Sequence, residues 1–154
     1  MSAEPARKFI DTNVLVYAHD VTADEKHARA RQLVADLWAN GNGCLSIQVL
    51  QEFYVTVTRK AHRPLDPGVA RQHVEDLGQW LVHSPTVGDV VEAIQLHQRA
   101  RLSFWDAMVL TSARKLNCDV LWSEDLNEGQ VLAGVTVRNP FNVAAQPGPT
   151  TQAV

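Results

Sequence analysis

The stretch KFIDTNVLVY, residues 8–17, decides how the rest of the chain is interpreted. Its apolar FI pair is typical of a short β-strand, and Asp11 ends that strand. Thr12 and Asn13 have side chains that cap helices, so we expect a helix to begin with Val14. Asp11 should therefore lie at the carboxyl end of a strand, where ligands bind in open α/β sheets.

The role of Asp11 depends on which other acids reach the same place. An Asp between a strand and a helix is, taken alone, more often a helix cap than a catalytic group. Further acids in comparable positions are candidates to join it: Glu52, Asp106 and Asp125.

The composition fits one soluble domain. The chain has 154 residues, of which 45% are apolar and 20% charged, enough for a single hydrophobic core. It has no apolar run long enough to span a membrane, and MSAEPARK at its start lacks the apolar region of a signal peptide, so we expect a cytoplasmic protein. The formal charge of −3 is unlike that of most nucleic-acid-binding domains, which are basic. Cys44 and Cys118 have no metal-ligand spacing and are expected to be buried.

Predicted helices and strands alternate along the chain. After residues 9–10, the sequence predicts strands at 44–45, 81–82, 120–122 and 135–137. Helices are predicted between them, over 23–39, over 46–60, after Pro67, after Thr86 and over 102–118. This order predicts an α/β fold with a parallel sheet of about five strands, flanked by helices on both faces. We expect one domain over residues 1–143 and a disordered tail over 144–154.

Local signals predict where helices begin and which side they bury. Capping signals occur at Thr22 with Glu25, at Ser46, at Asp66, at Thr86 with Asp89, and at Ser103 with Asp106. The helix after Thr86 is expected to bury Val87, Val90, Val91 and Ile94. The helix over 102–118 is expected to share one face among Trp105, Met108, Val109, Ser112 and Leu116.

Glu52 and Asp106 also have ordinary structural explanations. Glu52 lies on the flank of the apolar face of the 46–60 helix, where a surface Glu is common. Asp106 follows Ser103 by three residues, as in a capping box. The helix dipole would also keep Asp106 anionic, as a metal ligand must be, so the two interpretations are compatible.

Asp125 repeats the arrangement at Asp11, since an apolar strand is followed by a small hydroxyl residue, Ser123, and an acid. If Glu52 and Asp106 converge on these two acids, the four cannot all remain bare anions. Two charges about 4 Å apart repel by roughly 4 kcal/mol at an effective dielectric of about 20, and a domain is stable by only about 5–15 kcal/mol. Either a cation binds or a carboxyl group stays protonated.

The available ligand types favour a hard divalent ion. Oxygen ligands without His or Cys nearby favour Mg²⁺ or Mn²⁺ over zinc, and such an ion suits phosphodiester hydrolysis because it acidifies a bound water. The six histidines form no H-x-x-x-H or H-E-x-x-H pair. No P-loop, G-x-G-x-x-G or G-x-S-x-G motif occurs, so nucleotide binding and serine hydrolysis have no support in the sequence.

Several segments together carry a family resemblance: FIDTNVLVYA at 9–18, LSIQVLQEFY at 45–54, LSFWDAMVL at 102–110, and LWSEDLNEGQ with GVTVRNPF within 121–141. In this order the chain resembles the PIN-domain nucleases, and more closely the VapC-type ribonuclease toxins. The resemblance implies Mg²⁺- or Mn²⁺-dependent cleavage of RNA by a homodimer that a small antitoxin holds inactive. It places the acidic ligands at Asp11, Glu52, Asp106 and Asp125, and the polar residues beside them at Thr12, Asn13 and Ser123.

The leading hypothesis is a metal-dependent endoribonuclease. In it the ion is held by Asp11, Asp106 and Glu52, while Asp125 binds a second ion or orients the attacking water, and Ser123 and Thr12 support these acids. Arg99 and Arg101 either contact phosphate or form a solvated helix end.

Two other functions stay open at this point. A binding module would hold RNA or a partner protein at the same site without turnover. A phosphohydrolase would use Asp11 as a covalent nucleophile, but it would normally have a second acid where this chain has Asn13.

Overall fold

The computed structural model describes residues 5–142 and contains, within them, one sheet with the strand order β3-β2-β1-β4-β6-β5. The strands are β1 (Lys8–Ile10), β2 (Gly43–Ser46), β3 (Leu81–His83), β4 (Val120–Trp122), β5 (Val131–Leu132) and β6 (Val135–Arg138). All neighbouring pairs are parallel except β5 and β6. The predicted α/β class is confirmed, with β5 as an additional antiparallel strand that is too short to give a period-two pattern.

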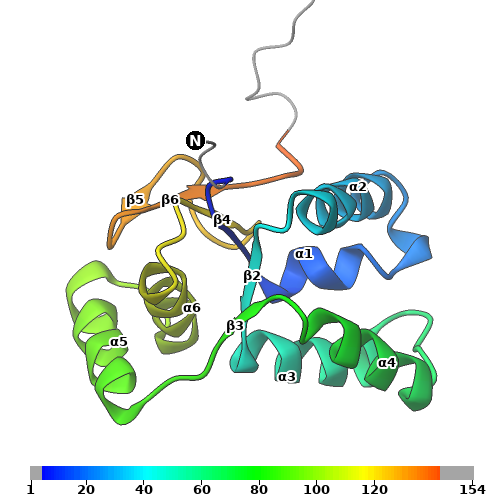
Figure 1. The fold of residues 1–154 in the computed structure, drawn as a ribbon, viewed down its shortest axis with the longest axis horizontal. Coiled ribbons are helices and arrows are strands. Elements are labelled where there is room, and N and C mark those ends of the chain that lie inside the picture. Colours follow the sequence, from blue (N-terminus) through cyan, green and yellow to red (C-terminus); the bar gives the residue numbers. More distant parts are fainter. Residues whose placement is uncertain (1–4, 143–154) are drawn as a thin grey trace, which may run out of the picture.

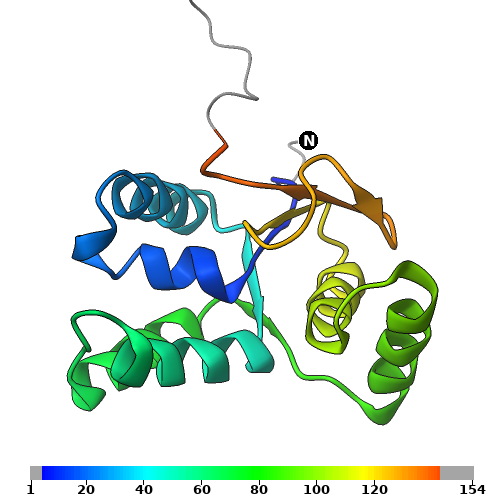
Figure 2. The same ribbon diagram turned by 180° about the vertical axis from the view of Figure 1, so that it is seen from behind.

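Helices cover both faces of the sheet. They are α1 (Thr12–Tyr17), α2 (Glu25–Asn40), α3 (Ile47–Val55), α4 (Pro67–Leu77), α5 (Val87–Ala100) and α6 (Phe104–Lys115), with a 3₁₀ turn at Val21–Ala23 and a π-helical turn at Thr56–Lys60. Figure 1 shows α5 and α6 on one side of the sheet and α1 to α4 on the other, and the reverse view in Figure 2 shows the same division. No helix within the described residues is long and apolar enough to cross a membrane.

The register of β1 brings distant segments to one edge of the sheet. Ile10 pairs with Trp122 of β4, and the backbone N–H of Asp11 donates to the Trp122 carbonyl at 2.9 Å. On its other side β1 pairs with β2, so the residues that follow these strands emerge side by side. The strands themselves are apolar because both faces are covered, and Phe9, Ile10, Leu45 and Leu121 are fully buried.

The helix N-caps predicted at Ser46, Asp66 and Thr86 are confirmed. Ser46 accepts from Val49 N, Asp66 accepts from Gly68 N, and Thr86 forms a reciprocal capping box with Asp89. The capping box at Thr22 is wrong, since the Thr22 hydroxyl donates to Asp20 and α2 begins only at Glu25. The first helix also begins earlier than predicted, because Asp11 itself is its N-cap.

The predicted 46–60 helix changes its winding near its end. It is α-helical to Val55, and then a π-helical turn runs from Thr56 to Lys60. The Ala61 N–H donates to the Thr56 carbonyl at 3.0 Å, which is the i to i+5 pattern of a π-turn. Such turns are rare and lie frequently at functional sites.

The buried face predicted for α5 is wrong except at Val90, which is half-buried and packs against the core. Its residues on the surface include Val87 (82% exposed), Val91 (48%) and Ile94 (39%). Asp89 determines the orientation, because its buried carboxylate accepts from Thr86 N at 2.9 Å and lies 3.0 Å from Nε2 of His83. In α6, Trp105 is likewise 60% exposed rather than buried. The predicted tail, 144–154, lies outside the described residues.

Candidate functional site

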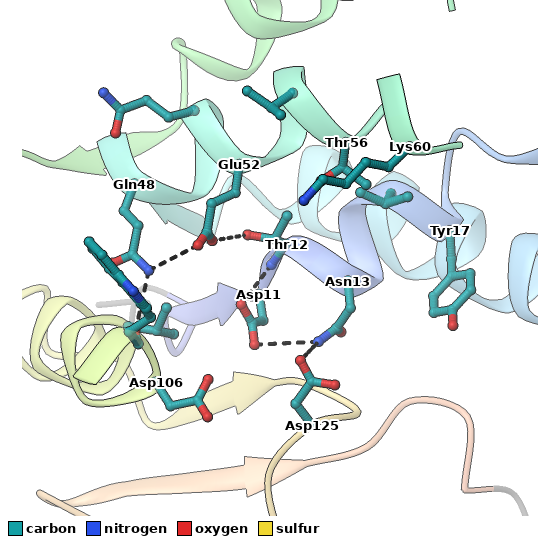
Figure 3. Close-up of a pocket in the computed structure, with 15 residues that line it drawn as sticks. Asp11, Thr12, Asn13, Tyr17, Gln48, Glu52, Thr56, Lys60, Asp106 and Asp125 are labelled. Carbon is teal, nitrogen blue, oxygen red and sulfur yellow. Dashed lines mark hydrogen bonds between the residues drawn. The ribbon is translucent and has the colours of Figure 1, made fainter. Parts of the chain in front are cut away.

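The four candidate acids line one cavity of about 630 Å³ at the carboxyl ends of the strands. They come from separate segments: Asp11 after β1, Glu52 on α3, Asp106 in the first turn of α6 and Asp125 after β4. Figure 3 shows these side chains around a common opening, with Thr12 and Asn13 among them. The fold therefore brings together residues that are more than a hundred positions apart in the chain.

Asp11 is both a helix cap and a lining group of the cavity. Its Oδ1 accepts from Thr12 N at 2.7 Å, as an N-cap does, and its Oδ2 accepts from Ser123 Oγ at 2.8 Å. Only 5% of Asp11 is exposed. Asp11 can therefore be a helix cap and a functional group at the same time.

The surroundings of Asp11 disfavour its charge. Burial raises its pKa from 3.8 to about 6, and the negative charges of Asp125 and Asp106 add to the rise, while the bonds from Ser123 and Thr12 oppose it. A buried carboxylate of this kind is stabilised in its ionised form by a nearby cation. Such a shift in a cavity is also typical of functional sites.

Glu52 is oriented by two donors. Thr12 Oγ1 donates to Oε1 at 2.7 Å, and Gln48 Nε2 donates to Oε2 at 3.4 Å. Gln48 also donates to the Trp105 carbonyl at 3.3 Å, at the start of α6. Glu52 is therefore linked both to the residue beside Asp11 and to the helix that carries Asp106.

Asp106 uses its backbone, but not its side chain, for capping. Its N–H donates to Ser103 Oγ at 3.0 Å, and no bond returns from its carboxylate to the Ser103 backbone among the described residues. The carboxylate instead faces the cavity (Figure 3). Burial raises the pKa of Asp106, with further contributions from Asp125 and Glu52.

Asn13 and Ser123 connect Asp125 to the rest of the site. Asn13 Nδ2 donates to Asp125 Oδ2 at 2.9 Å, and its Oδ1 accepts from Glu124 N at 3.3 Å. Asp125 N donates to Ser123 Oγ at 3.1 Å, the same hydroxyl that donates to Asp11. The two strand tips of β1 and β4 are thus joined by a small polar network.

The residues present fit a hard divalent ion held through water. Within residues 5–142, no three His, Cys, Asp or Glu side chains form a ready-made metal cluster. Mg²⁺, however, usually keeps several of its waters and is bound directly by only one or two carboxylates. The all-oxygen donor set suits such an ion, and its charge would favour the ionised forms of Asp11 and Asp106, whose pKa values burial raises.

Gln48 and Lys60 are among the lining residues that were not predicted as functional. Gln48 lies one helical turn before Glu52, and that spacing was the available signal. Lys60 lines the cavity from the end of the π-turn, which no local sequence pattern predicts. Arg99 and Arg101, predicted as possible phosphate contacts, are not among the residues lining this cavity.

The protein thus has an α/β fold with a carboxylate-lined cavity at the carboxyl ends of its strands. A PIN domain family model matches residues 8–129, which is most of the chain. The chain therefore belongs to the PIN domain family, and this family consists of nucleases. No curated protein sequence matches the chain significantly.

Similar solved structures come from toxin–antitoxin systems. VapC20 of Mycobacterium tuberculosis, described as a sarcin-ricin loop cleaving toxin, is 23% identical with a TM-score of 0.59, over 77% of this chain and 91% of that one. A toxin–antitoxin complex from Klebsiella pneumoniae is 17% identical with a TM-score of 0.63, over 87% and 98%. VapBC2 from Rickettsia felis, bound to a promoter DNA fragment, is 15% identical with a TM-score of 0.60, over 86% and 97%. At these identities the similarity establishes a shared fold.

Proposed function

We propose that the protein is a Mg²⁺- or Mn²⁺-dependent endoribonuclease and the toxin of a toxin–antitoxin pair. The observation that carries this proposal is the convergence of four carboxylates from four segments on one cavity, two of them with raised pKa values. Without a cation, ionised acids in this arrangement lower the stability of the folded protein, because they repel one another. Membership of the PIN domain family supports the same assignment.

In this mechanism the ion would be held by Asp11, Asp106 and Glu52. When bound, a divalent ion would offset charge on the phosphoryl oxygens and acidify the attacking water. Ser123 Oγ and Thr12 N hold the two oxygens of Asp11 in fixed directions, and Thr12 Oγ1 does the same for Glu52. These bonds orient the acids before substrate arrives.

In this mechanism Asp125 would bind a second ion or orient the attacking water. Its Oδ2 accepts from Asn13, while its Oδ1 has no protein donor among the described residues and faces solvent at the cavity. Oδ1 is therefore the oxygen that can accept a proton from the water or orient it. Asn13 keeps this carboxylate beside Asp11 rather than free in solvent.

Two protein partners belong to the proposal. The similar structures include toxin–antitoxin complexes, which supports a small antitoxin as partner. The exposed apolar residues of α5, Val87, Val91 and Ile94, lie at i, i+4 and i+7, so they form one stripe. A second copy of the chain covering this stripe would give the homodimer.

The direct test is cleavage of a single-stranded RNA by purified protein in Mn²⁺. We expect wild-type protein to cleave, and both chelator-treated protein and Asp11→Asn protein to be inactive. Asp76→Asn, which changes an exposed acid on α4, is the matched control and should cleave normally. Undiminished cleavage by Asp11→Asn protein would contradict the mechanism, and RNA affinity without turnover in wild type would instead indicate a binding module.

A further inference from the structure

The acidic cavity has one cationic residue in its lining, Lys60. Lys60 is exposed, and Figure 3 shows its amino group directed toward the side of the cavity where Thr12 and Asp11 lie. Within residues 5–142 it makes no ion pair of 4.0 Å or less. Lys60 thus lines a cavity that four carboxylates also line, and it is paired with none of them.

Glu52, eight residues before Lys60 in the same helical segment, is held by other donors. Both oxygens of Glu52 are engaged, one by Thr12 at the start of α1 and one by Gln48, one turn earlier on α3. Lys60 remains available for an anion that enters from solvent.

The π-turn explains why Lys60 reaches the cavity at all. The lining positions of this segment include Gln51 and Val55 and a series spaced by four residues: Gln48, Glu52, Thr56 and Lys60. In an uninterrupted α-helix, three such steps would turn the last position about 120° away from the first, because four residues exceed one 3.6-residue turn. A π-turn takes more residues per turn, so it reverses part of this drift and returns Lys60 to the cavity.

We propose that Lys60 binds a phosphate of the single-stranded RNA at the opening of the acidic cavity. This inference rests on the proposed function and names the residue that admits the substrate. A polyanion approaching four carboxylates needs a positive group at the entrance, and a chain of net charge −3 does not supply one by its overall field. A lysine amino group is a flexible point charge that suits phosphate contacts carrying no sequence information.

The neighbouring Arg59 gives a matched control. It carries the same charge, is equally exposed, and shares the end of the same helical segment, where either cation could merely complement the helix dipole. Arg59 does not line the cavity. Removing the charge of Arg59 or of Lys60 therefore changes the net charge of the protein equally. Only the change at Lys60 removes a cation from the cavity lining.

The test measures RNA binding without cleavage. Asp106→Asn protein is titrated with a single-stranded RNA oligonucleotide in Mg²⁺ at several salt concentrations, alone and combined with Lys60→Gln, Lys60→Arg or Arg59→Gln. Thermal melts confirm that each variant is folded. We expect Lys60→Gln to weaken binding about fivefold and to lower the slope of log K against log salt by about 0.7, as expected for one lost phosphate contact. Arg59→Gln and Lys60→Arg should each stay within about twofold of the parent.

The outcomes separate this inference from the proposed function. Equal binding by the Lys60→Gln and Arg59→Gln proteins, or no RNA binding by the parent, would overturn the role of Lys60 even if wild-type protein cleaves RNA. A selective loss at Lys60 would uphold it even if wild-type protein proves unable to cleave.

Discussion

Thr12 Oγ1 donates a 2.7 Å hydrogen bond to Glu52 Oε1, which joins the residue after Asp11 to α3 across 40 positions of sequence. We predict that Thr12→Val protein needs about tenfold more Mg²⁺ for half-maximal RNA cleavage, because Glu52 loses its orienting donor. Thr12→Ser protein keeps the hydroxyl and should behave like wild type. An unchanged Mg²⁺ requirement in Thr12→Val protein would show that this bond does not position Glu52 for the ion.

The raised pKa of Asp11 predicts how stability depends on pH without metal. The folded protein keeps a proton on Asp11 up to about pH 6, whereas the unfolded chain releases it near 3.8, so stability is lost as pH rises through this window. The loss amounts to about 3 kcal/mol for a shift of about two pKa units. Asp11→Asn protein lacks this pH dependence, because an asparagine side chain does not ionise.

Urea unfolding in chelator at pH 4 and pH 7.5 measures this effect. The free energy of unfolding of wild-type protein, relative to that of Asp11→Asn protein, should fall between these two values. Taking the difference between the two proteins removes the contributions of titrating groups that do not interact with Asp11. A constant difference would mean that the Asp11 carboxylate is ionised at little cost in the folded protein.

Divalent ions should stabilise the folded protein at pH 7.5. Mg²⁺ at about 100 times its dissociation constant would add about 2.7 kcal/mol, because it binds the folded state alone. The rise in melting temperature should be largely lost in Asp106→Asn protein and retained in Asp76→Asn protein. Equal rises in all three proteins would indicate binding away from the cavity.

The apolar stripe of α5 predicts the oligomeric state. Val91→Glu combined with Ile94→Glu should convert a dimer to a monomer in light scattering after size-exclusion chromatography, since two charges would be buried in the contact. Val69→Glu is the control, because Val69 is 47% exposed on α4 and Val91 is 48% exposed on α5. If wild-type protein is already monomeric at high concentration, α5 does not form the dimer contact.

Features set by neighbouring residues could be predicted from the sequence. The helix starts at Ser46, Asp66 and Thr86 are correct because each depends on a side chain and a backbone group only two or three residues apart. The strand tips at Asp11 and Asp125 follow from short apolar runs that end abruptly. The gathering of the acids at one edge then follows from a parallel sheet.

Features set by tertiary contacts could not be predicted in this way. The apolar stripe of α5 is a strong helical pattern, yet the buried bonds of Asp89 to Thr86 and His83 turn the opposite face inward. The π-turn that brings Lys60 to the cavity depends on how α3 ends against its surroundings. Gln48 could have been found by its spacing from Glu52, although that spacing is common on any helix.

The position of β1 between β2 and β4 has a consequence for the biosynthesis of this protein. One edge of β1 stays unpaired until β4 has left the ribosome, and the Ser123 hydroxyl that orients Asp11 arrives only with that strand. A nascent chain therefore lacks a complete acidic site until β4 and the Asp125 that follows it have been synthesised.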